Sequence, residues 1–401
     1  MKEAVKKKLK EISECLKETD VTNFNIGLTS GLTGINLFRV NYLHKENYDE
    51  KAQIINGYVY IFLEHLRRGN SGIYYADGLP GTLWYLSYLK NKKLIDIHPG
   101  FFTDFEKKID ECILNNIKTN QFDLFYGVIG CLLFYSEANI LSQKKILQKE
   151  IVKHLKKSAI VINKNQIAWQ LYHPLGKKEN NDKSSVNLGL SHGLPSIISC
   201  LLKFDTEFDE EIYPLVKKSI NYCLSYYSSS LISSFPYDAK LFSKLDANEY
   251  NSRLAWCYGD MGIACMLWNA GQRFNIKDWK KIAVAVITKC SNRKNAQEAR
   301  IVDSGICHGS AGVAHIFHRF YLYTNDLKIK KAADFWIERT LAMAQFSDGP
   351  AGYKRMHVNE LNQSVYLPDN GFLEGVSGIG LVLLGWLYPE TIDWDRSLLI
   401  S

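Results

Sequence analysis

Two glycines three residues apart recur seven times along the 401-residue chain, and this repeat constrains the fold more than any other feature. In the fourth copy a serine takes the place of the second glycine. The copies lie at residues 31–34, 78–81, 127–130, 193–196, 259–262, 309–312 and 375–378. Their spacing of 47 to 66 residues indicates a repeat architecture, in which each unit buries its apolar face against its neighbours.

Each glycine pair opens a stretch that is apolar on nearly every side, as at residues 263–268 and 379–384. A helix that is apolar all round is a buried helix. Amphipathic stretches with helical spacing of charged and apolar residues separate these runs, at about 2–18, 51–68, 102–118, 143–160, 210–228, 276–290 and 327–344. We therefore expect seven outer and seven inner helices in strict alternation.

This alternation, together with sparse strand signals, predicts an all-α fold of seven helical hairpins. Such hairpins can form an open solenoid or a closed ring. We favour a closed, double-layered α/α toroid, because buried inner helices need neighbours on all sides and neither end of the chain resembles a polar capping repeat. We expect a single domain over residues 1–401, with small insertions near 160–190, 229–252 and 345–372.

Charge and cysteine content limit the partners and the compartment. The net charge of +7 lies in runs such as residues 6–10, which we interpret as solvated helix faces. We find no nucleic-acid motif, no signal peptide and no apolar run long enough to cross a membrane, so at most peripheral membrane association is expected. The nine cysteines are odd in number and irregularly spaced, which is typical of thiols in a cytoplasmic protein.

The residues just before each glycine pair are expected to line the mouth of the ring. Glycines without side chains let the helix starts approach one another closely, so the seven inner helix N-termini converge at one end. The rim set is Ser30, Asp77, Tyr126, His192, Tyr258, His308 and Glu374, with Asp123, Cys257 and Cys307 nearby. Helix N-termini favour anions and lower thiol pKa values, so this rim is the predicted functional end.

Two cysteines and a histidine on this rim form a candidate metal site. Cys257 in the fifth repeat and Cys307 in the sixth hold the same position relative to the glycine pair, and His308 follows Cys307. Two thiolates and one imidazole suit Zn²⁺ and leave the fourth position open, as catalytic zinc sites do. A lone Cys-His pair is more often a buried thiol beside a capping histidine, but the matching Cys257 favours one zinc ion per chain.

These motifs together resemble the lanthionine synthetase C family, the stand-alone cyclases of lantibiotic biosynthesis. The resemblance covers nearly the whole chain and is carried by Ser191-His192-Gly193, Arg253-Leu254-Ala255-Trp256-Cys257-Tyr258-Gly259, Cys307-His308-Gly309-Ser310-Ala311-Gly312 and Asp123. It implies an α/α toroid with zinc on Cys257, Cys307 and His308 and water as the fourth ligand. It also implies addition of peptide cysteine thiols to dehydroalanine or dehydrobutyrine, which closes thioether rings in a ribosomally made precursor peptide.

The resemblance also implies roles for four further rim residues. His192 is expected to protonate the enolate or to take the thiol proton. The structural alternative is that it only caps a helix. Asp123 is expected to orient His192 or another rim group. Arg253 is expected to stabilise the enolate or to hold the site together. Tyr258 either forms a hydrogen bond at the metal or only packs.

Other residues and partners are assigned more loosely. Asp260 and Asp303 are expected to cap helices or to support the site from behind. Ser196 departs from the repeat pattern but lies away from the proposed ligands. No dehydratase or kinase-like segment precedes Gly31, so we expect a separate dehydratase, a dehydrated precursor peptide and possibly an exporter as partners.

Three alternative functions remain open at this point. The first is a LanC-like protein that binds zinc and glutathione and adds glutathione to dehydroamino acids, or only binds thiols. The second is a toroid glycoside hydrolase with Asp123 and Asp260 as its carboxylate pair. The third is a prenyltransferase, whose zinc ligands normally include a carboxylate. A glycoside hydrolase would leave the Cys257, Cys307 and His308 set unexplained.

Overall fold

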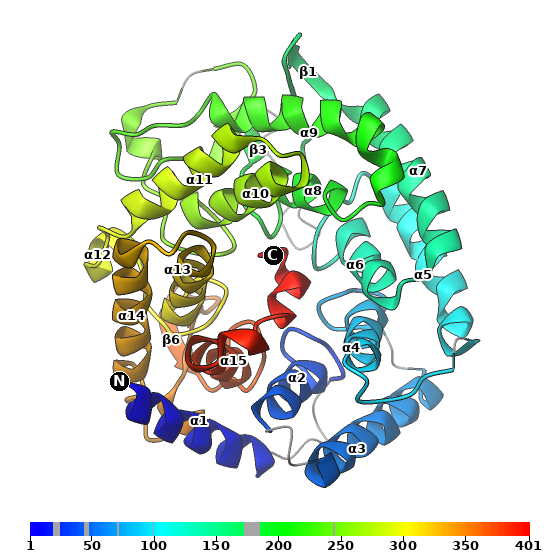
Figure 1. Ribbon diagram of the computed structural model, residues 1–401, viewed down its shortest axis with the longest axis vertical. Helices are drawn as coiled ribbons and strands as arrows, with labels where there is room; N and C mark the ends of the chain where they lie inside the picture. The colour runs from blue at the N-terminus through cyan, green and yellow to red at the C-terminus, as the bar shows by residue number, and fades with distance from the viewer. Residues whose placement is uncertain (19–24, 44–47, 70–71, 99, 172–184, 244) are drawn as a thin grey trace. The chain divides into compact units, whose positions relative to one another are not determined.

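A computed structural model describes residues 1–18, 25–43, 48–69, 72–98, 100–171, 185–243 and 245–401. Over these residues, amphipathic and apolar helices alternate along the chain (Figure 1). The chain divides into two compact units, Met1–Asp96 with Ser291–Trp394 and Ile97–Cys290 with Asp395–Ser401. We call them the first and second unit and describe each by itself. The predicted single domain stays a prediction.

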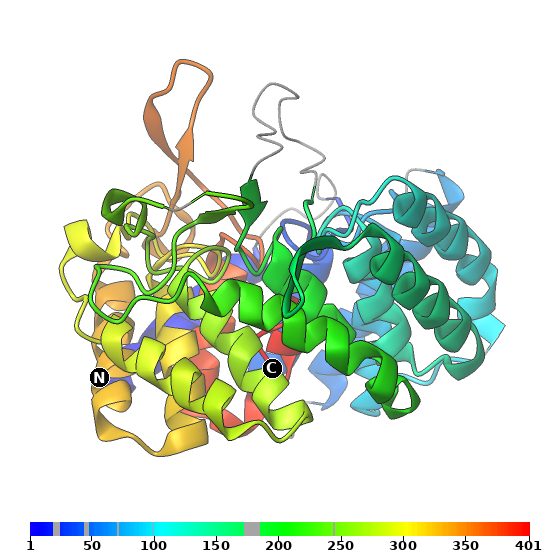
Figure 2. The ribbon, with the colours of Figure 1, turned by 90° about the horizontal axis from the view of Figure 1, so that it is seen from above.

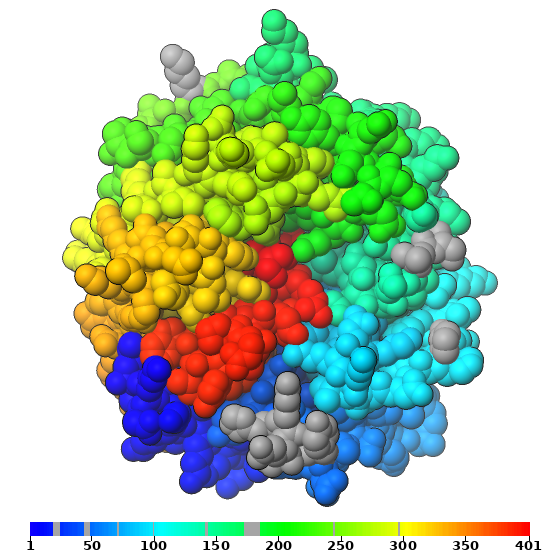
Figure 3. All heavy atoms as spheres, viewed as in Figure 1, coloured from blue at the N-terminus to red at the C-terminus, as the bar shows by residue number. Residues whose placement is uncertain are grey.

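The first unit holds both ends of the repeat array. Its amphipathic helices are α1 (Lys2–Lys17), α3 (Tyr48–Arg67) and α14 (Leu327–Ala342), and its apolar helices are α2 (Leu32–Tyr42), α4 (Leu79–Asn91), α13 (Ser310–Thr324) and α15 (Val376–Leu387), with a short α12 (Ala296–Ala299). The last apolar helix, α15, packs on the first, α2, and α1 packs on both α14 and α15 (Figure 3). The first and last apolar helices of the chain therefore lie side by side within this unit.

The second unit repeats the same alternation. Its amphipathic helices are α5 (Gly100–Lys118), α7 (Leu141–Ser158), α9 (Asp209–Leu224) and α11 (Lys277–Cys290), and its apolar helices are α6 (Val128–Ala138), α8 (Leu194–Leu201) and α10 (Asp260–Arg273). Helix α8 packs between α6 and α10. The C-terminal residues join this unit through an ion pair between Arg396 and Glu137 and through the Trp256 indole N–H, which donates to the Leu398 carbonyl at 2.9 Å.

The glycine pairs are required because the preceding loop folds back over the start of each apolar helix. The first glycine is the N-cap residue in all seven cases. A Cβ on the second glycine would meet the carbonyl oxygen six residues earlier, at 2.1 Å between Gly81 and Tyr75 and at 1.9 Å between Gly312 and Ile306. The closest contact is thus made by the backbone of the preceding loop. The neighbouring repeat also comes close, as the sequence suggested, because Leu28 Cβ would lie 2.9 Å from a Cβ on Gly81.

Strands are few and short in the described residues, and they form three two-stranded antiparallel sheets. The pairs are β1 (Ile160–Asn163) with β2 (Gln166–Ala168), β3 (Ser185–Asn187) with β4 (Asp238–Lys240), and β5 (Arg355–Val358) with β6 (Ser364–Leu367). All lie within the three ranges where insertions were predicted, although residues 172–184 fall outside the described part. The β5–β6 hairpin projects away from the helices of its own unit (Figure 2).

Candidate metal centre and catalytic residues

In five of the seven repeats the loop before the glycine pair is closed by a recurring backbone hydrogen bond. The amide just after the first glycine donates to the carbonyl seven residues earlier, from Leu32 to Asn25 at 2.8 Å and from Val376 to Asp369 at 3.1 Å. The intervening residues form a tight loop above the helix N-terminus, which is a favourable place for anions and metal-bound groups.

A side-chain turn holds four of these loops in shape, and the sequence analysis missed it. An Asn or Asp six residues before the first glycine accepts a hydrogen bond from the backbone amide of a glycine two residues further on. The pairs are Asn25 with Gly27, Asn187 with Gly189, Asp303 with Gly305 and Asp369 with Gly371, at 2.6 to 3.3 Å. This Asx-x-Gly pattern is visible in the sequence and is a known turn signal. The sequence analysis had defined the repeat by the glycine pair alone.

Neighbouring loops are joined by backbone hydrogen bonds at equivalent positions. In the first unit the Thr29 amide donates to the Ala76 carbonyl at 2.9 Å, and the Leu373 amide donates to the Thr29 carbonyl at 2.9 Å. In the second unit the Ser191 amide donates to the Cys257 carbonyl at 3.3 Å. The residue two places before the first glycine therefore holds the same position from loop to loop. Cys257 occupies that position in its repeat, as the sequence analysis assumed.

Cys257, Cys307 and His308 form the one group of three or more metal-binding side chains found among the described residues. The Sγ atoms of both cysteines and a ring nitrogen of His308 all lie within 4.8 Å of one another. Cys257 is buried, whereas Cys307 and His308 are partly exposed. Three such donors can converge on a single ion, and thiolate with imidazole is a set that suits Zn²⁺. The sequence prediction that these three residues meet is thus matched by the geometry.

Asp303 lies beside the His308 ring. Its Oδ2 atom is 3.7 Å from His308 Nε2 and accepts a hydrogen bond from the Met356 amide at 3.1 Å. Its Oδ1 atom accepts from the Gly305 amide at 3.3 Å. The carboxylate is therefore held on two sides by backbone amides, so its position next to the imidazole is set by the loop and by the start of β5.

His192 and Asp123 are in contact, although 69 residues separate them. The His192 Nδ1 atom lies 2.5 Å from Asp123 Oδ2, and only 2% of Asp123 is exposed. The other carboxylate oxygen accepts hydrogen bonds from the Phe125 and Tyr126 amides at 2.8 and 2.9 Å. Because its own loop fixes Asp123, the carboxylate can in turn fix the orientation of the imidazole.

Tyr258 lies near His192, with ring centroids 6.3 Å apart. Its hydroxyl accepts a hydrogen bond from the side-chain Nδ2 of Asn187 at 3.4 Å. A Cβ on Gly189 would come within 2.8 Å of the Tyr258 ring, so glycine is needed there to seat the aromatic ring. Gly189 had not been singled out from the sequence, where nothing marks its contact with a residue in the next repeat.

Arg253 and Asp260 differ in how their charged groups are bonded. The Arg253 amide donates to the Tyr237 hydroxyl at 2.9 Å, but its guanidinium forms no hydrogen bond or ion pair with any residue that the structure describes. Asp260 is fully buried, and its two oxygens accept from the Ser234 and Phe235 amides at 2.8 and 2.9 Å. Asp260 therefore anchors a loop, and its engaged carboxylate argues against the glycoside hydrolase alternative.

Two general observations accompany the site. Within the described parts of the chain, no helix has both the length and the apolarity that a bilayer crossing needs. All nine cysteines carry thiols and none forms a disulfide.

Comparison with known proteins identifies the family. The model of the lanthionine synthetase C-like proteins matches residues 22–399. The chain belongs to this family. The chain is also similar to the nisin biosynthesis protein NisC of Lactococcus lactis subsp. lactis, with 23% identity over 410 residues that cover 94% of this chain and 90% of NisC. Family membership confirms the resemblance drawn from the motifs and, with it, the enzyme class of lanthionine synthetases.

The fold is also shared with a solved structure. The chain is similar to nisin cyclase with a TM-score of 0.71 and 19% sequence identity, over 99% of this chain and 96% of the other. At this identity the likeness shows the fold alone. The predicted fold class, an all-α α/α toroid, is confirmed for this lanthionine synthetase C-like protein.

Proposed function

We propose that this protein is a zinc-dependent lanthionine cyclase. Its substrate is a ribosomally made precursor peptide that contains cysteine and dehydroalanine or dehydrobutyrine, and its product carries thioether rings. The observation that carries the proposal is the convergence of the Cys257, Cys307 and His308 donor atoms within 4.8 Å in a member of this family. Packing of adjacent repeats brings these equivalent positions together, but it does not require metal-binding side chains at them.

The donor set fits zinc. Cys257 and Cys307 as thiolates would neutralise the two positive charges of the ion, and His308 would complete three protein ligands. The carboxylate of Asp303 lies 3.7 Å from Nε2 of His308, where it would favour the ring proton on Nε2 and leave Nδ1 for the metal. Bound zinc supplies Lewis acidity, which favours the thiolate form of a substrate cysteine at neutral pH.

Ring closure requires one carbon–sulfur bond and one proton transfer. The thiolate sulfur bonds to the β-carbon of the dehydroamino acid, and the π electrons move to the carbonyl to form an enolate. A proton then adds to the α-carbon, so the overall reaction adds a thiol across a double bond and needs no oxidant. His192 is proposed to deliver this proton to the α-carbon or to take up the proton that the substrate thiol loses. Asp123 would hold Nδ1 protonated, so that Nε2 makes the exchange.

Arg253 and Tyr258 are proposed to assist. The Arg253 guanidinium has no ion-pair partner among the described residues, so its charge is available to stabilise the enolate oxygen. Tyr258 shares its loop with Cys257 and lies against His192, so its ring would limit how the substrate approaches the imidazole. We further propose a cytoplasmic location, which suits nine thiols, and a separate dehydratase and exporter as partners.

The test combines metal analysis with product analysis. The purified protein should hold about one zinc per chain and should consume the thiols of a dehydrated, cysteine-containing peptide without a change in the peptide mass. Cys307→Ala should lose both properties, whereas Cys200→Ala, at a buried cysteine in α8, should keep them. A chain that never retains zinc would refute the metal centre. Zinc retention with addition of glutathione, but no ring closure on any peptide, would instead support the thiol-transfer alternative.

A further inference from the structure

A cavity of about 350 Å³ lies in the first unit, between the end of α1 and the facing sides of α2 and α3. Its lining residues are Lys17, Leu32, Asn36, Arg39, Glu50, Gln53, Ile54, Gly57, Tyr58 and Ile61. None of these belongs to the rim loops that carry the proposed metal centre. The volume lies within the range of small-molecule sites, which are mostly apolar with a few well-placed polar groups.

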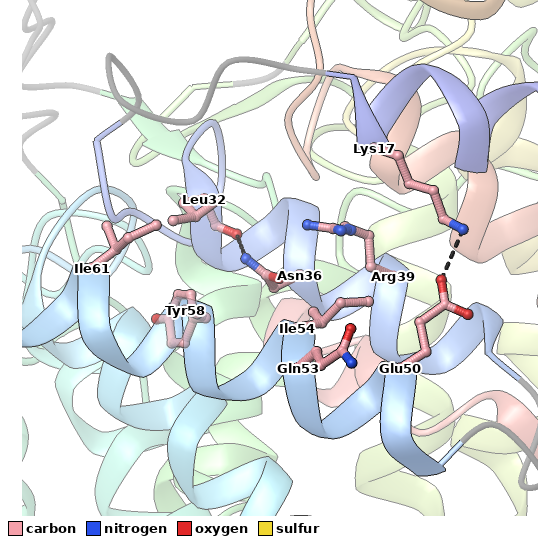
Figure 4. Close-up of a pocket in the computed structure, with 10 residues that line it drawn as sticks. Lys17, Leu32, Asn36, Arg39, Glu50, Gln53, Ile54, Tyr58 and Ile61 are labelled. Atoms are coloured by element: carbon pink, nitrogen blue, oxygen red, sulfur yellow. Dashed lines mark hydrogen bonds and ion pairs between the residues drawn. The ribbon is translucent and has the colours of Figure 1, made fainter.

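One positive charge in this cavity is not neutralised. Lys17 and Glu50 form an ion pair at 2.8 Å, visible at one end of the cavity in Figure 4. The guanidinium of Arg39 has no such partner among the described residues, and its Nε atom is buried without a hydrogen bond. Burial lowers the pKa of Arg39, which reflects the cost of holding this charge in the protein. An unsatisfied buried donor is rare in native proteins and requires an explanation.

An unsatisfied acceptor lies one helical turn away. Asn36 is 2% exposed, and its amide nitrogen donates to the Leu32 carbonyl at 3.0 Å. Its Oδ1 atom is buried and has no hydrogen-bond partner among the described residues. The hydroxyl of Tyr58 is already engaged with Thr33 at 2.7 Å, so it does not serve Asn36. The cavity thus offers a cation that lacks an anion and an acceptor that lacks a donor.

An exposed glycine borders the open side of the cavity. Gly57 lies in the interior of α3, where glycine is unfavourable relative to alanine. A Cβ at this position would meet nothing within 4 Å, so packing does not require glycine here, in contrast to the paired glycines of the repeats. The empty space beside Gly57, lined by Leu32, Ile54 and Ile61, has room for an apolar group.

We propose that this cavity binds a small carboxylate with an N–H group on the neighbouring carbon and an apolar side chain, the chemistry shared by a peptide C-terminus and a free α-amino acid. The planar guanidinium of Arg39 matches a carboxylate, which it can bind with two parallel hydrogen bonds. Asn36 Oδ1 accepts the N–H. The aliphatic wall near Gly57 receives the side chain.

The experiment uses three probes on the full-length protein, with binding followed by calorimetry and thermal shift. N-acetyl-L-leucine should bind with a Kd that is roughly millimolar or tighter, as expected for a ligand of this size. N-acetyl-L-leucinamide lacks the carboxylate and should bind at least about tenfold more weakly. L-leucine replaces the amide N–H with an ammonium group. A preference for leucine would identify a free amino acid as the ligand, and a preference for the acetylated form would identify a peptide end.

Two variants test the site without removing a structural contact. Arg39→Met deletes the charge but keeps the aliphatic stem, and Gly57→Met fills the open space from a helix that tolerates methionine. Both should weaken N-acetyl-L-leucine binding by at least about tenfold, and neither should lower the melting temperature of the ligand-free protein. Cys307→Ala should leave this binding unchanged, which separates the cavity from the proposed cyclase activity.

Several outcomes would overturn the proposal. No binding by the wild-type chain at millimolar probe would do so, as would equal binding of the carboxylate and the carboxamide. Unchanged affinity in both variants would show that the probe binds elsewhere. Unfolding of Arg39→Met would show that Arg39 supports the fold and does not serve a ligand.

Discussion

The Nδ1 atom of His192 and the Oδ2 atom of Asp123 meet at 2.5 Å, and the second oxygen of the same carboxylate accepts two backbone amides of its own loop. One rim residue is thereby held in place by another from the preceding repeat. The imidazole cannot turn without breaking this contact, so its tautomer and its direction are coupled to a buried carboxylate.

Asp123→Asn should slow ring closure by about 10²- to 10⁴-fold, because an amide no longer favours the Nδ1–H tautomer of His192. Zinc content should not change, since Asp123 is not a proposed ligand. The measurements are the cyclisation rate on a dehydrated peptide and the metal content of the same preparation. Asp104→Asn, at an exposed position of α5, is the control and should behave like wild type. Normal turnover in the Asp123 variant would remove His192 from the proposed mechanism.

Two glycine-to-alanine substitutions should have opposite effects on stability. At Gly81 a Cβ would lie 2.1 Å from the Tyr75 carbonyl oxygen and 2.9 Å from Leu28 Cβ, so Gly81→Ala should cost about 2–4 kcal/mol of unfolding free energy. At Gly57 a Cβ meets nothing, so Gly57→Ala should add about 0.5–1 kcal/mol. Denaturant unfolding measures the change in unfolding free energy of each variant, and both variants should keep the m-value of the wild type. Equal effects at the two sites would contradict the packing account of the repeat glycines.

His318 should make stability depend on pH. Burial lowers the pKa of His318 to about 4, below the value of about 6.5 expected in the unfolded chain. The unfolded state therefore binds a proton more readily than the folded state. The unfolding free energy is highest above pH 6.5, where His318 is uncharged in both states, and it decreases as the pH falls toward 4. The loss should reach about 3 kcal/mol.

His318→Gln should flatten that part of the pH profile, as measured by unfolding at pH 7, 5.5 and 4. His357→Gln, at an exposed position of β5, should leave the profile unchanged. If the wild-type and His318 profiles run parallel between pH 7 and 4, another group is responsible for the acid sensitivity.

The C-terminal residues should contribute to the stability of the second unit. Arg396 donates to both oxygens of Glu137, at 2.6 and 2.8 Å, and the Glu137 side chain is only 6% exposed. Arg396→Met should cost about 3–5 kcal/mol because it removes the main counter-charge of a buried carboxylate. The double variant with Glu137→Gln should recover most of the loss in thermal unfolding. A double variant as unstable as the single one would point to packing, and not charge, as the cause.

Helix positions were largely predictable from the sequence. The apolar helices begin at the glycine pairs, and the amphipathic helices agree with the predicted stretches to within a few residues, as for α7 at Leu141–Ser158 against 143–160. Hydrophobic periodicity and glycine placement are local signals, so they can be read without knowing which segments meet. The short strand pairs were not predicted, because pairs such as β3 with β4 join segments about 50 residues apart and carry too few residues to show alternation.

The sequence by itself determined the repeat, the helical class and the residue types of the metal group, because each of these follows from spacing along the chain and from the chemistry of single side chains. The tertiary structure alone decided the contact of the Tyr258 ring with Gly189 and the open space beside Gly57. The family resemblance had named His192 or another rim group as the partner of Asp123, and the tertiary structure decided that it is His192 Nδ1. A glycine in the sequence does not by itself reveal whether a nearby carbonyl oxygen requires it, as at Gly81, or whether it borders a cavity, as at Gly57. That distinction depends on which atoms the fold brings within a few ångströms, and these atoms come from residues that local sequence does not connect.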